Sequence, residues 1–264
     1  MPILHYRAGD ALIHYGRTGP DGPPLLCLPG LGTRSAYLAG LAGRLGRGLV
    51  LPDFPGTGQS EPLRGLRHDP ATLADVVIAL IEEIGAGPLD IFGHSLGGTV
   101  ACVVAARRPD LVGALIVGEG NFAPGGGAAS SAIAAQDVED FVARGFAARQ
   151  AKLREKALEG DGLAAAIHAA CRGDDPRALH EMAVGLVDLQ PGVREAFLAH
   201  PGRRVFVYGA RTFPGDDPGR VTPDAPAPAP LRAAGVAIEV VPGAGHLMPL
   251  EAPAATAEAL ARHL

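Results

Sequence analysis

The sequence predicts an α/β protein whose mainly parallel sheet is covered by helices on both faces. Two observations on the sequence indicate this fold class. Short apolar runs, which are typical of strands buried on both sides, alternate along the chain with segments of helical periodicity. The 264 residues, of which 47% are hydrophobic, are also enough to bury a large core. Because ligands of such sheets bind beyond the carboxyl ends of the strands, we expect functional residues at that edge.

The strands are predicted in chain order from their apolar character. The first two form a hairpin, because two strand-like runs flank the short turn Ala8-Gly9-Asp10. Further apolar runs complete an expected set of eight strands. The strands are expected at residues 3–7, 11–15, 24–28, 49–52, 89–92, 114–117, 205–208 and 236–241.

Helices are predicted between these strands. A short helix is expected at residues 35–43, with Ser35 as its N-cap. We expect Thr72 to cap the next helix, whose apolar residues recur at i, i+3, i+4, i+7, i+8 and i+11 and so form one side. Residues 222–230 are rich in Pro and Ala, which predicts an extended loop. Two further helices are expected at residues 99–106 and 254–264.

The stretch from residue 122 to residue 201 differs from the rest of the chain. It opens with a flexible Pro-Gly-Gly-Gly run and continues with helical patterns but no evident strand. Because this stretch is far longer than an ordinary connection between strands, we expect it to lie as a cap over the carboxyl edge of the sheet. The prediction is therefore a core domain of residues 1–121 and 202–264, with a helical cap insertion at 122–201. The helical patterns cover residues 138–158, 163–171 and 177–189.

Composition argues against several classes of function. The net charge is −5 and no cluster of Lys and Arg stands out, so nucleic acid is not an expected partner. No apolar run reaches the roughly 18 residues that suggest a membrane span. The N-terminus has no signal-peptide pattern, so we expect a cytoplasmic protein without a membrane partner. No Cys or His spacing suggests a metal, no cofactor is expected, and the three cysteines are predicted to be reduced.

The most informative motif is Gly93-His94-Ser95-Leu96-Gly97-Gly98, which stands between an expected strand and an expected helix. A sharp strand-to-helix turn crowds the backbone and so requires small residues two positions before and after Ser95. This is the pattern of a nucleophile elbow, which exposes the serine hydroxyl to a base. The alternative interpretation is a glycine-rich helix start with Ser95 as a cap.

Four segments together resemble the α/β-hydrolase fold superfamily, of the type with a serine nucleophile. They are residues 28–32 (Leu-Pro-Gly-Leu-Gly), 53–60 (Asp-Phe-Pro-Gly-Thr-Gly-Gln-Ser), 93–98 and 242–246 (Pro-Gly-Ala-Gly-His). The resemblance covers nearly the whole chain in the right order. It implies a mainly parallel, eight-stranded α/β-hydrolase sheet flanked by helices.

The resemblance also implies roles for individual residues. Ser95 is the expected nucleophile, and His246, on a glycine-rich loop after the last strand, is the expected base. The backbone N–H groups of Leu31 and Leu96 are expected to form the oxyanion hole. Many family members have His-Gly where this chain has Pro29-Gly30. His94 is expected to be turned away from Ser95, into the packing of the sheet.

The acid of the triad departs from the usual family pattern. Thr212 stands a few residues after the seventh strand, where most members have a carboxylate. We favour Glu119, because it follows the sixth strand, where some members carry the acid. Asp216 and Asp217 remain alternatives in a turn-like segment. Asp53 is expected to organise its own loop.

The function expected from these residues is acyl cleavage or transfer on a small to medium ester, thioester or lactone, through an acyl-enzyme on Ser95. The expected partner is therefore a small-molecule acyl substrate, and the oligomeric state is left open. The same fold also hosts C–C bond hydrolases, hydroxynitrile lyases and peroxidase-like enzymes. Since Thr212 replaces the usual acid, a ligand-binding receptor with a vestigial triad is a further alternative.

Overall fold

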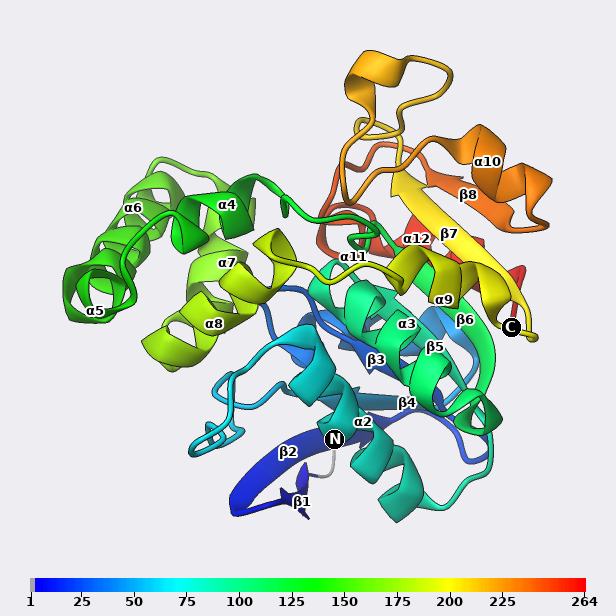
Figure 1. Cartoon of the computed structure of the whole chain (residues 1–264), viewed down its shortest axis with the longest axis horizontal. Helices are drawn as coiled ribbons and strands as arrows, with labels where there is room; N and C mark the ends of the chain where they lie inside the picture. The colour runs from blue at the N-terminus through cyan, green and yellow to red at the C-terminus, as the bar shows by residue number, and fades with distance from the viewer. Residues whose placement is uncertain (1–2) are drawn as a thin grey trace.

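The computed structural model describes residues 3–264; residues 1–2, which open the predicted core domain, lie outside the described residues. Eight strands form one sheet in the order β1-β2-β4-β3-β5-β6-β7-β8 (Figure 1). The pairs β1–β2 and β2–β4 are antiparallel, and all other neighbours are parallel. The predicted fold class is therefore confirmed. The strands are β1 (Ile3–Ala8), β2 (Ala11–Thr18), β3 (Leu25–Leu28), β4 (Leu49–Pro52), β5 (Leu89–His94), β6 (Val112–Gly118), β7 (Arg204–Gly209) and β8 (Ala237–Val241).

The central strands are largely apolar because helices cover both of their faces. In β3, Leu26 and Leu28 pack into one hydrophobic cluster, while Leu25 and Cys27 pack into the cluster on the opposite face. All four side chains are completely buried. This alternation follows from the two-residue period of a strand, and it explains why the run shows no polar-apolar pattern.

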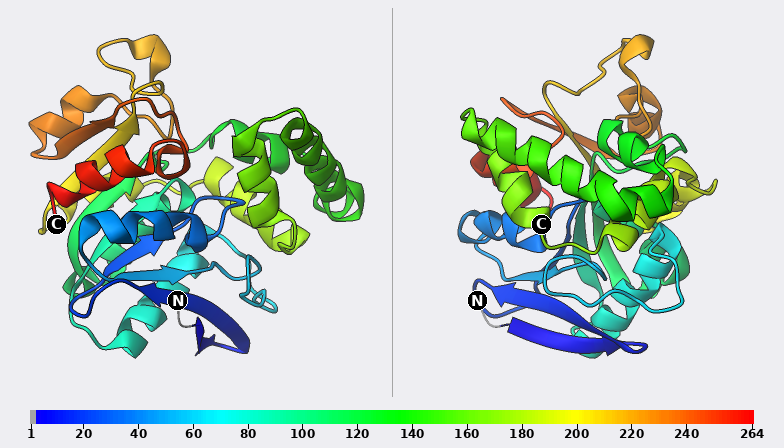
Figure 2. Two further views of the ribbon diagram at one scale, coloured as in Figure 1. Left: turned by 180° about the vertical axis from the view of Figure 1, so that it is seen from behind. Right: turned by 90° about the vertical axis from the view of Figure 1, so that its left-hand side faces the viewer.

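One face of the sheet is covered by α2 (Pro70–Ile84), α3 (Leu96–Arg107) and α9 (Val193–Ala199), as Figure 1 shows. The opposite face is covered by α1 (Ala42–Leu45) and α12 (Pro253–Ala261), which come to the front in the reverse view (Figure 2). Two short helices, α10 (Pro228–Ala233) and α11 (Met248–Glu251), flank β8 in the chain.

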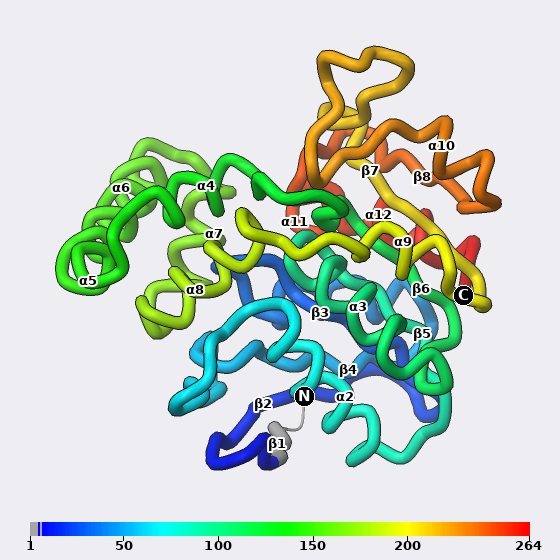
Figure 3. Tube along the Cα trace, viewed as in Figure 1, coloured from blue at the N-terminus to red at the C-terminus, as the bar shows by residue number. Residues whose placement is uncertain are grey.

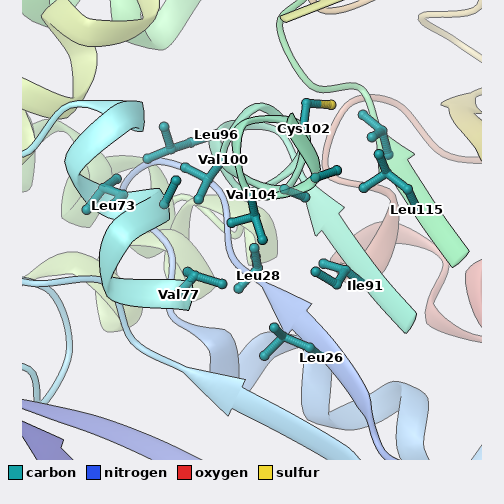
Figure 4. Packing of buried hydrophobic residues seen from close by; sticks show 14 of the residues in the cluster. Leu26, Leu28, Leu73, Val77, Ile91, Leu96, Val100, Cys102, Val104 and Leu115 are labelled. Atoms are coloured by element: carbon teal, nitrogen blue, oxygen red, sulfur yellow. The ribbon is translucent and has the colours of Figure 1, made fainter. Parts of the chain in front are cut away.

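The cluster under α2 and α3 holds the helix that follows Ser95 against the sheet. Leu96, Val100 and Val104 of α3 point between Leu73 of α2 and Leu28 of β3 (Figure 4). Burying each of these side chains contributes on the order of 1.5–3 kcal/mol. The packing of α3 against the sheet therefore fixes the position of its first turn, which follows Ser95.

Six α-helices lie between β6 and β7 in the chain (Figure 3). Side chains of α4, α7 and α8 line the same cavity as Ser95, which places this group at the carboxyl ends of the strands. The last helix before β7, α9, packs against α3 instead. The assignment of residues 122–201 to a separate cap stays a prediction. The five helices before α9 are α4 (Ala128–Ala134), α5 (Val138–Asp140), α6 (Phe146–Leu158), α7 (Gly162–Cys171) and α8 (Pro176–Val187).

Two predicted helix caps are wrong. The N-cap of α2 is Asp69, whose carboxylate accepts the N–H of Thr72 at 2.9 Å, and Pro70 takes the first helical position. Ser35 lies inside a short 3-10 helix, Ser35–Leu41, and its hydroxyl donates to the carbonyl of Leu51 at 2.9 Å. Ser35 has another partner in the tertiary structure, whereas at α2 a residue three positions earlier than Thr72 is the cap.

The predicted loop at residues 222–230 is also partly wrong, because α10 begins at Pro228. Proline fixes φ near its helical value and is favoured at the first helical position, so the Pro-Ala composition does not exclude a helix start. Sequence reasoning missed α4 and α9, which have only seven residues each and too few turns for a clear periodic pattern.

Candidate active site

Ser95 lies at the sharp turn between β5 and α3. Its backbone has φ 53° and ψ −121°, a conformation that is costly for a residue with a side chain. A Cβ atom on Gly93 would collide with the carbonyl of Gly97, and a Cβ on Gly97 would collide with the carbonyl of Leu28. The two glycines of the motif are therefore required by close backbone contacts, as expected for an elbow.

The histidine loop after β8 brings His246 to Ser95. His246 Nε2 lies 3.0 Å from Ser95 Oγ, although the two residues are 151 positions apart. The loop is held by Glu251, whose carboxylate accepts the N–H groups of Gly245 and Leu247, each at 3.0 Å. Arg211 in turn pairs with Glu251. The imidazole is thus placed by several contacts to its own loop.

Glu119 holds the other side of the imidazole. Its Oε2 lies 2.8 Å from His246 Nδ1, and its side chain is 1% exposed. Its Oε1 accepts the backbone N–H of Gly209 at 2.8 Å and the hydroxyl of Thr212. A buried carboxylate needs such partners, since an isolated charge would cost several kcal/mol. Thr212, in the place where an acid was expected, donates to the carboxylate from the segment that follows the neighbouring strand β7.

The two alternative acids do not reach the histidine. Asp216 and Asp217 are exposed, and Asp217 accepts the N–H of Gly219 in a short turn. Asp53 is buried, and its carboxylate lies 3.0 Å from His14 Nδ1 and 3.0 Å from the Ser35 hydroxyl. Asp53 therefore ties loop segments together.

A second carboxylate near the imidazole was not foreseen. Asp224 Oδ2 lies 3.5 Å from His246 Nδ1, and the Asp224 side chain is 17% exposed. It belongs to the segment between β7 and α10, which the sequence analysis treated as an extended loop. Its local pattern, Thr-Pro-Asp-Ala, signals a turn and nothing about a distant histidine.

The surroundings of His246 change its pKa in opposing directions. Partial burial of the imidazole acts to lower the pKa of His246, while the hydrogen bond and charge of Glu119, together with the charge of Asp224, act to raise it. The net result is a pKa of His246 above its ordinary value. The site therefore favours the imidazolium form that arises when the base accepts a proton.

His94 supports the histidine loop from beneath. It is turned into the protein as expected, and its Nε2 lies 2.7 Å from the backbone carbonyl of His246. Because a carbonyl only accepts, Nε2 carries the hydrogen, and Nδ1 of the neutral ring accepts from the Tyr37 hydroxyl at 2.6 Å. Burial, followed by the nearby His246, lowers the pKa of His94 to about 3, which keeps the ring neutral. Sequence reasoning missed this contact, which depends on how close the two loops lie.

The amides expected to form the oxyanion hole have no acceptor within residues 3–264. Neither the N–H of Leu31 nor that of Leu96 takes part in a hydrogen bond among these residues. Leu96 is the first residue of α3, so its N–H is one of those that a helix leaves unpaired. Both amides are thus available to a ligand.

A cavity of about 610 Å³ opens at Ser95 and His246. Leu31 and the helices of the predicted cap provide its apolar walls, with Leu163, Ile167 and Leu186 among them. Charged side chains also line it, among them Arg149 and Asp224. Such a mixed lining suits a small molecule with an apolar part and a polar reacting centre.

Over the described part of the chain, no group of three or more His, Cys, Asp or Glu side chains is arranged to hold a metal ion. No helix formed by residues 3–264 is long and apolar enough to cross a membrane.

Comparison with known sequences gives one family match. The model of the alpha/beta hydrolase family matches residues 25–259. The chain is 36% identical over 107 residues to lipase LipV of Mycobacterium tuberculosis, and 31% identical over 113 residues to a haloalkane dehalogenase of Mycolicibacterium paratuberculosis. These alignments cover 40% and 41% of this chain, and 40% and 38% of the respective relatives. The chain thus matches only about two fifths of the length of these curated relatives.

Solved structures resemble the fold over its whole length. An esterase from Thermogutta terrifontis superposes with a TM-score of 0.76 at 20% identity, covering 99% of this chain and 97% of that one. The N-acyl homoserine lactonase AidH gives a TM-score of 0.74 at 19% identity, covering 99% and 96%. A thioesterase domain from the curacin biosynthetic pathway gives 0.72 at 20% identity, covering 100% and 99%. At these identities the similarity concerns the fold.

Proposed function

The chain belongs to the alpha/beta hydrolase family, and from that premise we propose that it is a serine hydrolase that cleaves or transfers an acyl group of a small to medium ester, thioester or lactone. The observation that carries the proposal is the unbroken row of contacts from Ser95 through His246 to Glu119, at 3.0 and 2.8 Å. A nucleophile, a base and an orienting acid in this order form the arrangement that activates a serine hydroxyl.

The first half-reaction forms the acyl-enzyme. Ser95 Oγ attacks the carbonyl carbon of the substrate while its proton passes to His246 Nε2. Glu119 accepts the hydrogen bond from Nδ1 and stabilises the imidazolium. The carbonyl oxygen becomes negative and is bound by the N–H groups of Leu31 and Leu96. His246 then gives its proton to the leaving oxygen or sulfur as the bond to the acyl carbon breaks.

The second half-reaction releases the acyl group. A water molecule attacks the acyl carbon, and its proton passes to His246 Nε2. The bond to Ser95 Oγ breaks as the imidazolium returns this proton to the serine oxygen. The products are the free acid and the original enzyme. An alcohol in place of water would give acyl transfer by the same steps.

The cavity and the comparisons support an acyl substrate. The apolar walls of the 610 Å³ cavity suit an acyl chain of moderate length. Structures with this fold include an esterase, a lactonase and a thioesterase domain, all of which act on acyl compounds. A receptor would need no connected nucleophile, base and acid, so the contacts around His246 favour an enzyme.

The proposal is tested with nitrophenyl esters and a fluorophosphonate probe. We expect rapid hydrolysis of a short-chain ester, and a loss on the order of 10⁴-fold or more in Ser95→Ala. Mass spectrometry of peptides should place the phosphonyl adduct on Ser95. Ser131→Ala, at an exposed serine of α4, is the matched control and should behave as wild type. A probe adduct on another residue, or undiminished hydrolysis in Ser95→Ala, would refute the mechanism.

A further inference from the structure

Asp224 is held with one carboxylate oxygen toward the base. Its Oδ1 accepts the hydroxyl of Thr222 at 2.7 Å, while its Oδ2 lies 3.5 Å from His246 Nδ1. A side chain that only stabilised its own turn would need the first contact alone. The second contact directs a charge at the same nitrogen that Glu119 binds.

Hydrogen bonds and close packing hold the turn that carries Asp224 in position. Thr222 and Ala225 exchange backbone hydrogen bonds of 3.1 and 3.2 Å across it. The carbonyl of Pro223 accepts the N–H of Phe122 at 2.9 Å, which joins the turn to the segment after β6 that carries Glu119. Gly127 packs closely on the other side, where a Cβ would lie 3.0 Å from Asp224 Oδ2.

We propose that Asp224 is a second acid of the site, a positioning residue that acts through His246 beside Glu119. Glu119 keeps the hydrogen bond to Nδ1, and Asp224 adds a negative charge that stabilises the imidazolium. When Glu119 loses its charge, Asp224 remains as the only carboxylate within ion-pair distance of His246 among residues 3–264. The kinetic part of this inference rests on the proposed function, whereas the effect on the titration of His246 does not.

Other charged groups around the histidine loop do not replace Asp224. His94 is neutral and meets the backbone carbonyl of His246. Glu251 accepts backbone N–H groups of the loop and pairs with Arg211, so its charge is offset. The carboxylates that face Nδ1 from neighbouring elements are Glu119 after β6 and Asp224 between β7 and α10.

The first experiment follows the imidazole of His246 by NMR as a function of pH, which requires no activity. In Asp224→Asn we expect the pKa of His246 to fall, because a negative charge beside the imidazolium is lost while the shape of the side chain and its bond to Thr222 remain. Thr222→Val, which frees Asp224 from its turn, should give a smaller shift in the same direction. Asp217→Asn is the matched control on the same segment and should leave the titration unchanged. An unchanged titration in Asp224→Asn would overturn the proposal.

The second experiment is a double-mutant cycle on ester hydrolysis. Asp224→Asn alone should lower kcat by about two- to fivefold with KM nearly constant. In the background of Glu119→Gln, the same change should lower kcat by about tenfold or more, because no carboxylate then faces Nδ1. An equal effect in both backgrounds would show a structural role only and would refute the second-acid assignment. If wild type hydrolyses no ester, the proposed function fails, and the NMR titration still decides the role of Asp224.

Discussion

Ser95 and Glu119 share a positive φ angle, 53° and 46°, and no other non-glycine residue among residues 3–264 does. Side chains strongly disfavour this region, so each conformation costs on the order of 1–3 kcal/mol. Both residues follow adjacent parallel strands, β5 and β6, and both touch the ring of His246. Backbone strain is therefore concentrated at the residues that contact the proposed base.

The strain at Ser95 predicts a difference between two inactive variants. Ser95→Gly and Ser95→Ala both remove the nucleophile, but only glycine adopts φ 53° and ψ −121° without strain. We expect Ser95→Gly to have the higher Tm, by an amount equivalent to roughly 1 kcal/mol or more. Calorimetry of the two variants checks this. Equal melting temperatures would mean that the elbow stores little strain.

Glu119→Gln tests the choice of acid. The amide keeps the size of the side chain but removes the charge that holds the imidazolium, so kcat should fall by roughly tenfold or more. Asp216→Asn and Asp217→Asn are the controls and should retain wild-type turnover, since both carboxylates are exposed and lie away from the histidine. A loss in either control, with Glu119→Gln unaffected, would reverse the assignment.

The pKa of His246 predicts the pH dependence of activity. The base must be neutral, so kcat/KM should fall as the pH drops through a pKa above the ordinary imidazole value of about 6.5. In Glu119→Gln this limb should move to lower pH, because the charge that raises the pKa is gone. A limb that stays in place would show that another group controls the profile.

The contribution of His246 to folding stability should fall as the pH rises, whereas activity should rise. The folded-state pKa of His246 is raised, so its contribution to stability is fully present below the unfolded-state pKa and is lost as the pH rises through the folded-state pKa. The Tm difference between wild type and His246→Asn should therefore be largest in mildly acidic buffer and shrink toward alkaline pH. Thermal melts across this range measure it, and a difference that grows with pH would contradict the ion pair.

His94→Phe tests the support of the histidine loop. Phenylalanine fills a similar volume but cannot donate to the carbonyl of His246, so kcat should fall by roughly tenfold through misplacement of the base. Tyr37→Phe removes only the next hydrogen bond and should cost less. Neither variant should shift KM strongly, which steady-state kinetics on one ester can establish.

Ile167→Trp probes the acyl side of the cavity. The larger side chain narrows an apolar wall contributed by α7, so long-chain esters should lose kcat/KM by about tenfold or more relative to short ones. Ala169→Trp, at an exposed position of the same helix, is the control. An equal effect on all chain lengths would mean that the acyl group lies elsewhere.

Much of this architecture could be predicted from local pattern. All eight strands were expected close to where they lie, because their apolar runs are separated by turn residues or helices, and the central ones are buried on both faces. The elbow was foreseen because its backbone contacts admit only glycine at Gly93 and Gly97. Predictions failed where a polar residue has a distant partner, as Ser35 does in Leu51. They also failed for α4 and α9, which are too short for a clear period.

The sequence by itself determined the order of strands and helices and the backbone-limited turn at Ser95, since both depend on neighbours within a few positions. Only the tertiary structure decided which carboxylates face His246. Glu119 and Asp224 are 127 and 22 positions away from it. Glu119 meets it because parallel strands end at a common edge of the sheet, and Asp224 meets it through a turn that is bonded to Phe122 after β6. The Thr212 hydroxyl likewise reaches the Glu119 carboxylate because β6 and β7, which these residues follow, are paired in the sheet. Strand neighbours in space, rather than residue spacing, set these contacts.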